Sequence, residues 1–347
     1  MKELGMWLQP YKDELLYSLF SRYHIRKGHL FLVNTAEDLF ENQRRQAEIE
    51  FFDKLTEEAC YHLTRKRSME DVIMEHTMFK QYAKFLPLSK RVSALKDLVQ
   101  MKGRYTESLA MPWYTNENKR YLRYCPCCVK EDREELGEAF WKTIHQLRGV
   151  SICPIHHCRL YNGNVIIGRK QQLNFVALET QELNMNVQIS VDEIEIKLAD
   201  YVYRVFRQPV SFENDVSITD FMNSKLEYTK YISTSGSMKK LQILCDDFFE
   251  YYKTIEDIPY GLMNREQVDS VFLGYRFNMY EICKLGMLLG IREDEFMDLK
   301  LPEVSQQQRF IDEVMSLYSQ GISSWNIAKI LDTNGTLVKN TIKRQLK

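Results

Sequence analysis

Two short cysteine motifs constrain this sequence more than any other feature. Cys125 and Cys128 enclose two residues, and twenty-four residues later Cys153 and His156 enclose two more. Zinc prefers a tetrahedron of thiolate and imidazole ligands, and a spacing of two residues lets one tight turn present both ligands to the same ion. Both motifs also begin with Cys-Pro. We therefore predict one structural Zn²⁺ ion held by Cys125, Cys128, Cys153 and His156.

Three neighbouring residues compete for the same places, namely Cys127, His157 and Cys158. Spacing favours the first set, because adjacent cysteines do not easily reach one tetrahedron together. Four protein ligands leave no open position for water or substrate, so we expect a structural site and not a catalytic one. His145 lies between the two motifs, either as a packed structural residue or as an outer partner of the zinc ligands.

The composition is typical of a globular protein. The chain has 347 residues, of which 44% are hydrophobic, which suits two or three globular domains. A formal net charge of −1 excludes a globally basic nucleic-acid coat, so attraction to DNA must come from local patches. Five of the eight cysteines fall between positions 125 and 158, which favours metal binding over disulfides.

The N-terminus does not have the pattern of a signal peptide, and no stretch approaches the roughly twenty apolar residues of a membrane span. We therefore expect a cytoplasmic protein with no membrane partner.

Apolar periodicity predicts a mainly α protein: a helical N-terminal domain, a small zinc-ribbon-like module, and a helical C-terminal domain that ends in a helix-turn-helix. The predicted divisions are 1–115 (N-terminal helical domain), 116–165 (zinc-binding module), 166–208 (connecting strand and helix), 209–237 (linker), 238–302 (helical domain) and 303–347 (helix-turn-helix).

The last division has the pattern of three helices, over 310–318, 324–331 and 336–346, separated by Gln320-Gly321 and by a turn at 332–335. In a helix-turn-helix the second helix of the motif enters the major groove. If Val338, Ile342 and Leu346 face inward, Lys339 and Asn340 are candidates for base edges, and Lys343 and Arg344 for phosphates. A helical packing module without DNA contact is the alternative.

Two other groups of cations are candidates for contacts with DNA. The zinc module contains Arg120, Arg123, Lys142 and Arg148. Because the acidic run 131–135 opposes them, this module is expected to meet DNA with one edge and a protein with the other. Residues 79–104 hold seven Lys or Arg against one acid, which fits a solvated helix face or a nucleic-acid contact equally well.

The first half of the chain contains several blocks in a fixed order. They are Pro10-Tyr11-Lys12-Asp13-Glu14-Leu15-Leu16-Tyr17-Ser18, His76-Thr77-Met78-Phe79-Lys80-Gln81-Tyr82, Tyr124-Cys125-Pro126-x-Cys128, Phe140-Trp141-x-x-x-His145-Gln146-Leu147-x-Gly149-Val150, and Cys153-Pro154-x-His156. Together these blocks resemble the TniQ/TnsD family of transposon target-selection proteins. Beyond residue 200 the likeness is weaker and closer to TnsD-type members.

The resemblance implies an adaptor that is not an enzyme. Such a protein recognises double-stranded DNA at the insertion site of a bacterial transposon and recruits a TnsC-like AAA+ ATPase regulator of the transposase. The alternative is a TniQ-type recruitment protein that bridges an RNA-guided effector complex to the ATPase, with little DNA specificity of its own. A zinc-dependent nucleic-acid enzyme would need an open metal site or a carboxylate pair, and the sequence offers neither convincingly. TnsD-type proteins are usually longer, so we expect either a shortened chain or a compact member.

Overall fold

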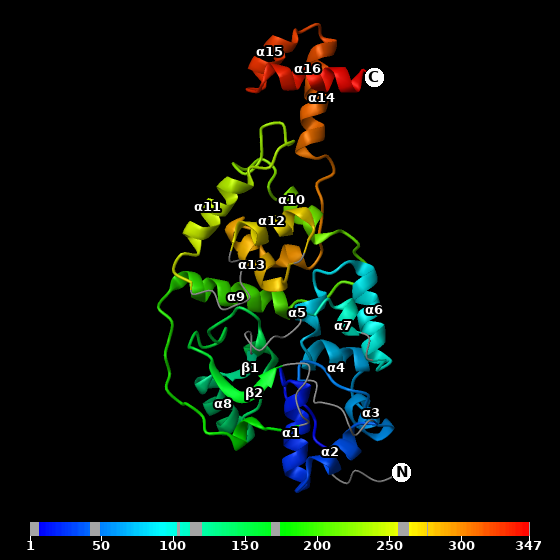
Figure 1. Cartoon of the computed structure of the whole chain (residues 1–347), viewed down its shortest axis with the longest axis vertical. Helices are drawn as coiled ribbons and strands as arrows, with labels where there is room; N and C mark the ends of the chain where they lie inside the picture. Colours follow the sequence, from blue (N-terminus) through cyan, green and yellow to red (C-terminus); the bar gives the residue numbers. More distant parts are fainter. Residues whose placement is uncertain are drawn as a thin grey trace.

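The computed structural model of the chain describes residues 7–41, 49–102, 105–111, 120–167, 174–255, 264–275 and 277–346. The fold is mainly helical, as predicted, with one small two-stranded sheet. Figure 1 shows an elongated molecule in which the N-terminal helices and the sheet lie at one end and α14–α16 lie at the other. None of the helices in the described ranges is long and apolar enough to cross a membrane.

The N-terminal part is a bundle of short helices around a hydrophobic core of its own. Its core includes Leu16, Leu19, Phe20 and Tyr23, which lie at three- and four-residue steps along the first helix. Side-chain caps define several of the helix starts, since Thr56 and Ser68 each accept a hydrogen bond from the first turn of the helix that follows. The helices are α1 (Leu16–Lys27), α2 (Leu32–Leu39), α3 (Glu57–Thr64), α4 (Met69–His76), α5 (Phe79–Ala83), α6 (Leu88–Val99) and α7 (Tyr105–Ser108).

Part of the basic run 79–104 is internal. The Lys84 ammonium donates hydrogen bonds to the carbonyl oxygens of Gln208 and Pro209 at 3.2 and 3.0 Å. The Arg91 guanidinium donates to the carbonyl of Asn214. Both side chains are about 4% exposed. These two cations therefore join α5 and α6 to the segment that follows α9, and neither is part of a solvated helix face.

The zinc module is built on the antiparallel pair of β1 (Arg120–Tyr124) and β2 (Tyr161–Ile167), with Tyr124 opposite Tyr161 and an irregularity between Tyr121 and Arg123. The helix α8 (Pro126–Leu136) and the 3₁₀ turn η2 (Thr143–Gln146) lie between the strands in sequence. The boundary predicted between 115 and 116 lies outside the described residues.

This module contains fully buried apolar residues. Trp141 is fully buried, and its indole N–H donates to the carbonyl oxygen of Val176 at 2.9 Å. Trp141 and Leu147 belong to the same hydrophobic cluster as Leu198 and Leu285 of the C-terminal helices. The zinc module therefore shares its core with the second half of the chain.

The segment 209–237, predicted as a linker, is also part of this core. It contains α10 (Ile218–Ser224), in which Ile218, Phe221 and Met222 are buried. In the segment 166–208, predicted as a connecting strand and helix, no strand forms over 175–191. That stretch carries the 3₁₀ turn η3 (Leu178–Thr180) and a bridge between Ile189 and Cys158. The helix predicted in this segment is present as α9 (Glu193–Arg207), with Asp192 as its N-cap.

The remaining helices form a central layer and a terminal unit. The central layer consists of α11 (Leu241–Tyr251), α12 (Arg265–Leu273), α13 (Met279–Leu288) and the 3₁₀ turn η4 (Glu293–Phe296). The terminal unit consists of α14 (Gln306–Ser319), α15 (Ser324–Ile330) and α16 (Gly335–Gln345), close to the three predicted helices. This unit has a small hydrophobic cluster of its own, separate from the other two.

Candidate metal centre

The hairpin brings the two cysteine motifs together. Cys125 directly follows β1 and is the N-cap of α8, and Pro126 takes the first helical position, where a missing N–H costs nothing. Cys128 lies in the first turn of the same helix. On the other side, the Cys153 carbonyl accepts a hydrogen bond from the backbone N–H of His157 at 2.8 Å, which closes a tight turn just before β2.

The four predicted ligands converge on one point. Their ligand atoms, three Sγ and the His156 Nδ1, all lie within 4.8 Å of one another. Cys128 Sγ is 3.8 Å from Cys153 Sγ, and His156 Nδ1 is 3.5, 3.3 and 3.7 Å from the sulfurs of Cys125, Cys128 and Cys153. A tetrahedral zinc ion with its usual bond lengths would separate two sulfurs by about 3.8 Å and sulfur from nitrogen by about 3.6 Å. The donor set therefore fits one zinc ion.

Groups around these ligands support metal binding. The Nε2 of His156 lies 2.8 Å from a carboxylate oxygen of Glu131 on α8, which is the usual outer partner of a metal-bound imidazole. The backbone N–H of Cys128 points to Cys125 Sγ at 3.4 Å. Among the protein groups alone, hydrogen bonds from Cys125 and Cys128 lower the pKa of Cys153, and the Cys153 sulfur raises the pKa of His156 to about 10. Because zinc binds neutral imidazole, its binding would release a proton from this cluster.

His145 is an outer neighbour of the cluster, as one of its two predicted roles requires. Its Nε2 lies 3.8 Å from Cys153 Sγ, and burial lowers the pKa of the ring to about 4. A neutral ring with its proton on Nε2 can donate to the sulfur. Its buried Nδ1 has no hydrogen-bond partner among the described residues, and in that tautomer it is an acceptor only.

The competing residues occupy different positions. His157 Nε2 faces the Asp200 carboxylate at 2.9 Å, away from the cluster. Cys127 and Cys158 form a second group with Cys125, and Cys158 Sγ lies 3.3 Å from Cys125 Sγ. This second group offers three sulfurs only, whereas the first offers a complete set of four ligands. A closed set of this kind can join α8 to the hairpin but leaves no position for a substrate.

The structure corrects the prediction for the cations of the zinc module, starting with Arg120 and Arg123. Arg120 is 9% exposed, and its guanidinium forms an ion pair with Glu50 at 3.0 Å and donates to the carbonyl of Gln146 at 3.0 Å. The Arg123 guanidinium donates to the carbonyl oxygens of Leu147, at 2.6 Å, and Val150. Both arginines therefore satisfy internal acceptors and are not available to phosphates.

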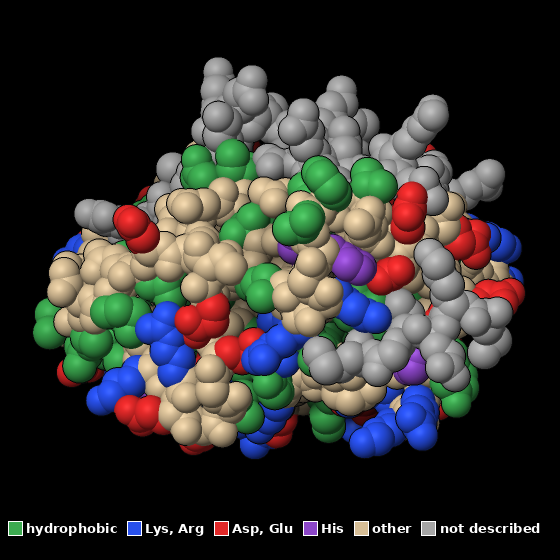
Figure 2. Space-filling model, turned by 90° about the horizontal axis from the view of Figure 1, so that it is seen from below, with side chains coloured by type: hydrophobic (Ala, Val, Ile, Leu, Met, Phe, Trp, Pro, Cys, Tyr) green, Lys and Arg blue, Asp and Glu red, His purple; other side chains and the backbone are tan. Residues whose placement is uncertain are grey.

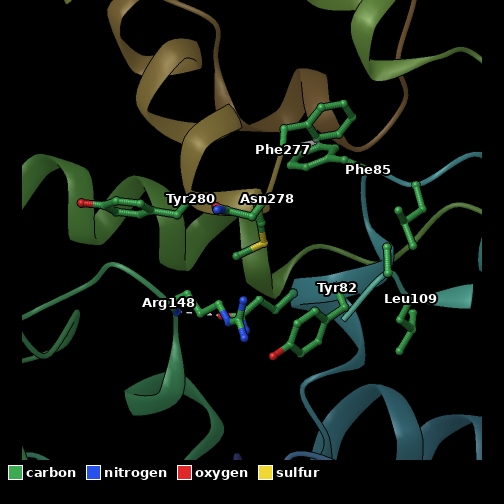
Figure 3. Close-up of a pocket in the computed structure, with 11 residues that line it drawn as sticks. Tyr82, Phe85, Leu109, Arg148, Phe277, Asn278 and Tyr280 are labelled. Carbon is green, nitrogen blue, oxygen red and sulfur yellow. Dashed lines mark hydrogen bonds between the residues drawn. The ribbon is translucent and has the colours of Figure 1, made fainter. Parts of the chain in front are cut away.

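Lys142 and Arg148 are also engaged inside the protein. The Lys142 ammonium pairs with Asp132 at 2.7 Å and lies over the Phe140 ring. Arg148 is 7% exposed, and its guanidinium lies 5.0 Å from the centre of the Tyr82 ring. Figure 3 shows Arg148 and Tyr82 on the wall of a pocket between the N-terminal helices and α13. Neither side chain is placed for a DNA contact.

The surface at this end of the molecule has mixed charge. Figure 2 shows Lys and Arg interspersed with Asp and Glu over the visible described surface, with no continuous basic area. Isolated cations among acids give little net attraction to a phosphate backbone. This surface therefore suits a protein contact better than a DNA contact.

The four candidates in the last helix, in contrast, are all exposed. Lys339, Asn340, Lys343 and Arg344 lie on the outer side of α16, while Val338 and Ile342 are buried as predicted. Leu346, which was expected to face inward, is 63% exposed because α16 ends at Gln345. The α16 cations form no ion pair with any described residue, so their charge is open to a ligand. They lie at the opposite end of the molecule from the metal centre (Figure 1).

Sequence reasoning missed the part of Glu131 in the metal centre, since it had counted this residue only in an acidic run. A signal was available: Glu131 follows Cys128 by three residues, a spacing that places both on one face of a helix. That spacing indicates a shared face only if a helix begins at the ligand turn, as α8 does, and the sequence did not predict a helix there.

Comparison with known proteins points to a single family. Residues 6–160 match the family model named TniQ. Over 176 residues the chain is 27% identical to the transposon Tn7 transposition protein TnsD of Escherichia coli, and the aligned part covers 50% of this chain and 34% of TnsD. The TniQ match includes all four candidate metal ligands and both N-terminal blocks.

Proposed function

On the TniQ match at residues 6–160 and the similarity to Tn7 TnsD, we propose that this chain is a TniQ/TnsD-family protein that selects the insertion site of a bacterial DNA transposon. The observation that carries this proposal is the TniQ match, since it spans the N-terminal helices and the metal centre. The similarity to Tn7 TnsD, a transposition protein, supports the same function.

The three C-terminal helices are the proposed DNA reader. We assign α15 and α16 as a helix-turn-helix, with α16 in the major groove. The turn between them is short, and Asn334 caps α16 by accepting a hydrogen bond from Thr336 N–H. Exposed cations without an acidic partner are expected to bind phosphates, and the exposed Asn340 amide suits an adenine edge.

The metal centre has a structural part in this proposal. A zinc ion there would hold α8 against the hairpin and so stabilise the mixed-charge end of the molecule. We propose that this end contacts a protein partner, the AAA+ ATPase that regulates the transposase. In this role the chain is an adaptor and not an enzyme, and the cutting and joining of DNA fall to its partners.

Binding of purified protein to labelled duplexes tests the DNA-reading role. We expect a duplex that contains the insertion site of the transposon to bind more tightly than a scrambled duplex, without any guide RNA. The double variant Lys339→Glu and Lys343→Glu should weaken binding to both duplexes, because two acids replace two cations on the helix proposed to enter the groove. The lost phosphate contact of Lys343 should also lower the slope of the salt dependence by about one.

A matched control changes the same charge elsewhere. Lys130→Glu with Lys253→Glu alters two lysines that are 74% and 62% exposed, the first on α8 and the second in the turn after α11. If this control lost as much DNA affinity as the α16 variant, the effect would be one of net charge and the assignment of α16 would be wrong. Binding that required an RNA-guided effector would also contradict a direct reading of the insertion site.

A further inference from the structure

Two of the sequence blocks, around Pro10 and around His76, meet at one pocket. The pocket has a volume of about 440 Å³ and is lined from the loop before α1, the end of α4, the start of α5 and the end of α9. No candidate metal ligand and no residue of α14–α16 lines it. The metal centre and the DNA reader therefore leave this part of the TniQ domain without a role.

The pocket has an excess of positive charge. Four cations line it, Lys12, Arg67, Lys80 and Arg207, against the two acids Asp13 and Glu75. Each acid is paired with one arginine: Asp13 with Arg207, and Glu75 with Arg67 at 3.3 Å. The charges of the two lysines remain uncompensated by these pairs.

Lys80 is the most informative of these side chains. It is half-buried, and its ammonium lies 4.9 Å from the centre of the Phe206 ring. Among the described residues, no carboxylate or carbonyl accepts a hydrogen bond from this ammonium. Burial and the nearby Arg207 lower the pKa of Lys80, so its charge is held at a cost. An ammonium with open donors beside an aromatic ring is ready to bind an anion.

Arg67 is held in place at the wall of the same pocket. His76 Nδ1 lies 2.8 Å from the Glu14 carbonyl, which leaves Nε2 to accept a hydrogen bond from an Arg67 Nη1 at 2.7 Å. This contact orients the guanidinium. The positive charge of Arg67 therefore adds to the attraction for an anion, while the Lys80 ammonium supplies the open donors.

The walls of the pocket are held in place by backbone contacts. Thr143 N–H donates to the Asp13 carbonyl and Leu15 N–H donates to the Trp141 carbonyl, both at 2.8 Å. These bonds attach the loop before α1 to the zinc module. The site is therefore largely formed before a ligand arrives, which lowers the entropic cost of binding.

The surroundings favour a protein ligand over DNA. A duplex backbone meets exposed surface with many phosphates at once, and here Glu75, which is 60% exposed, lies among the cations. A single flexible acidic side chain can instead enter the pocket and reach Lys80. We propose that this pocket binds an acidic segment of a partner protein, with one carboxylate on the Lys80 ammonium. This inference rests on the adaptor role proposed above, in which the chain contacts a protein as well as DNA.

Binding of a fluorescent hexaglutamate peptide with blocked ends, compared with hexaglutamine, tests the pocket. Lys80→Met removes the charge but keeps the aliphatic contact with Phe206, so the fold should be retained. We expect hexaglutamate to bind wild type and to lose about tenfold or more in affinity with Lys80→Met. The control Lys96→Met, at an exposed lysine of α6, should bind hexaglutamate as wild type does.

The same proteins are tested with insertion-site DNA, so that the two roles can fail separately. Equal binding of the two peptides to wild type would overturn the proposal that this pocket binds an acidic segment. Equal binding of hexaglutamate by wild type and Lys80→Met would overturn it as well. A loss of DNA affinity in Lys80→Met with no change in peptide binding would assign the pocket to phosphodiester and overturn it as well. Loss of peptide binding with DNA binding intact supports the pocket, and it would do so even if specific DNA recognition were absent from wild type.

Discussion

The Nε2 atom of His156 lies 2.8 Å from a carboxylate oxygen of Glu131, which lies in the second turn of the helix that Cys125 caps. This contact orients the imidazole so that Nδ1 faces the three sulfurs. It also places a negative charge next to the ligand, which makes the ring a better donor to a metal. The helix that carries two of the candidate ligands thus also positions a third.

Glu131→Gln should therefore weaken metal binding without removing it. The amide keeps an oxygen near His156 but lacks the charge, and loss of such an outer partner typically costs about tenfold in metal affinity or more. Competition with a chromophoric zinc chelator measures the change. The control is Glu134→Gln on the same helix, 65% exposed and only loosely paired with Lys130. Equal zinc affinities for wild type and Glu131→Gln would show that the contact does not support the centre.

Cys128→Ser should abolish the metal site. One lost thiolate opens a closed set of four, so bound zinc should fall from about one ion per chain to nearly none, and the free energy of unfolding by about 3 kcal/mol or more. Metal analysis and thermal melting measure the two effects.

The neighbouring Cys127 provides the matched comparison for Cys128. Cys127 lies outside the compact set of four, so Cys127→Ser should keep its zinc and melt close to wild type. If the two variants exchanged these behaviours, the metal would be held by the second group of sulfurs, Cys125, Cys127 and Cys158.

Arg123→Met should destabilise the protein and leave DNA binding unchanged. The guanidinium satisfies the carbonyl oxygens of Leu147 and Val150, and hydrogen bonds from a charged donor are worth about 1.5–3 kcal/mol each. We expect a loss of about 3–6 kcal/mol in chemical denaturation and no change in the salt dependence of DNA binding. If Arg123→Met had normal stability and its DNA affinity depended less on salt, Arg123 would be a DNA contact after all.

The metal centre could be predicted from the sequence because its determinants are local. The two-residue spacings, the Cys-Pro starts and the turn positions all act within a few residues of the four candidate ligands. The same holds for α9 and α16, whose starts at Asp192 and Asn334 are marked by side-chain caps. Local signals were sufficient wherever the structure depends on near neighbours in sequence.

The roles of the cations could not be predicted in this way, because burial depends on residues far along the chain. Arg120 is paired with Glu50, seventy positions away, and Lys84 donates hydrogen bonds to carbonyls more than one hundred and twenty positions away. The predicted linker was wrong for a related reason. Its Asn, Asp and Ser residues obscured the short apolar set at Ile218, Phe221 and Met222, which packs against distant helices.

The last prediction concerns Lys84, which joins α5 to the end of α9. Burial lowers the pKa of Lys84 to about 7 in the folded protein, below its ordinary value of 10.5. The folded chain therefore binds fewer protons than the unfolded chain between these values, so the stability contributed by this group rises with pH across that window and is lost as pH falls toward 7.

Relative to Lys84→Met, which has no group to titrate, wild type should gain up to about 1.4 kcal/mol per pH unit above pH 7. Chemical denaturation at several pH values measures the difference between the two proteins. Parallel pH profiles for wild type and variant would mean that Lys84 keeps its charge inside the fold, supported by the carbonyls of Gln208 and Pro209.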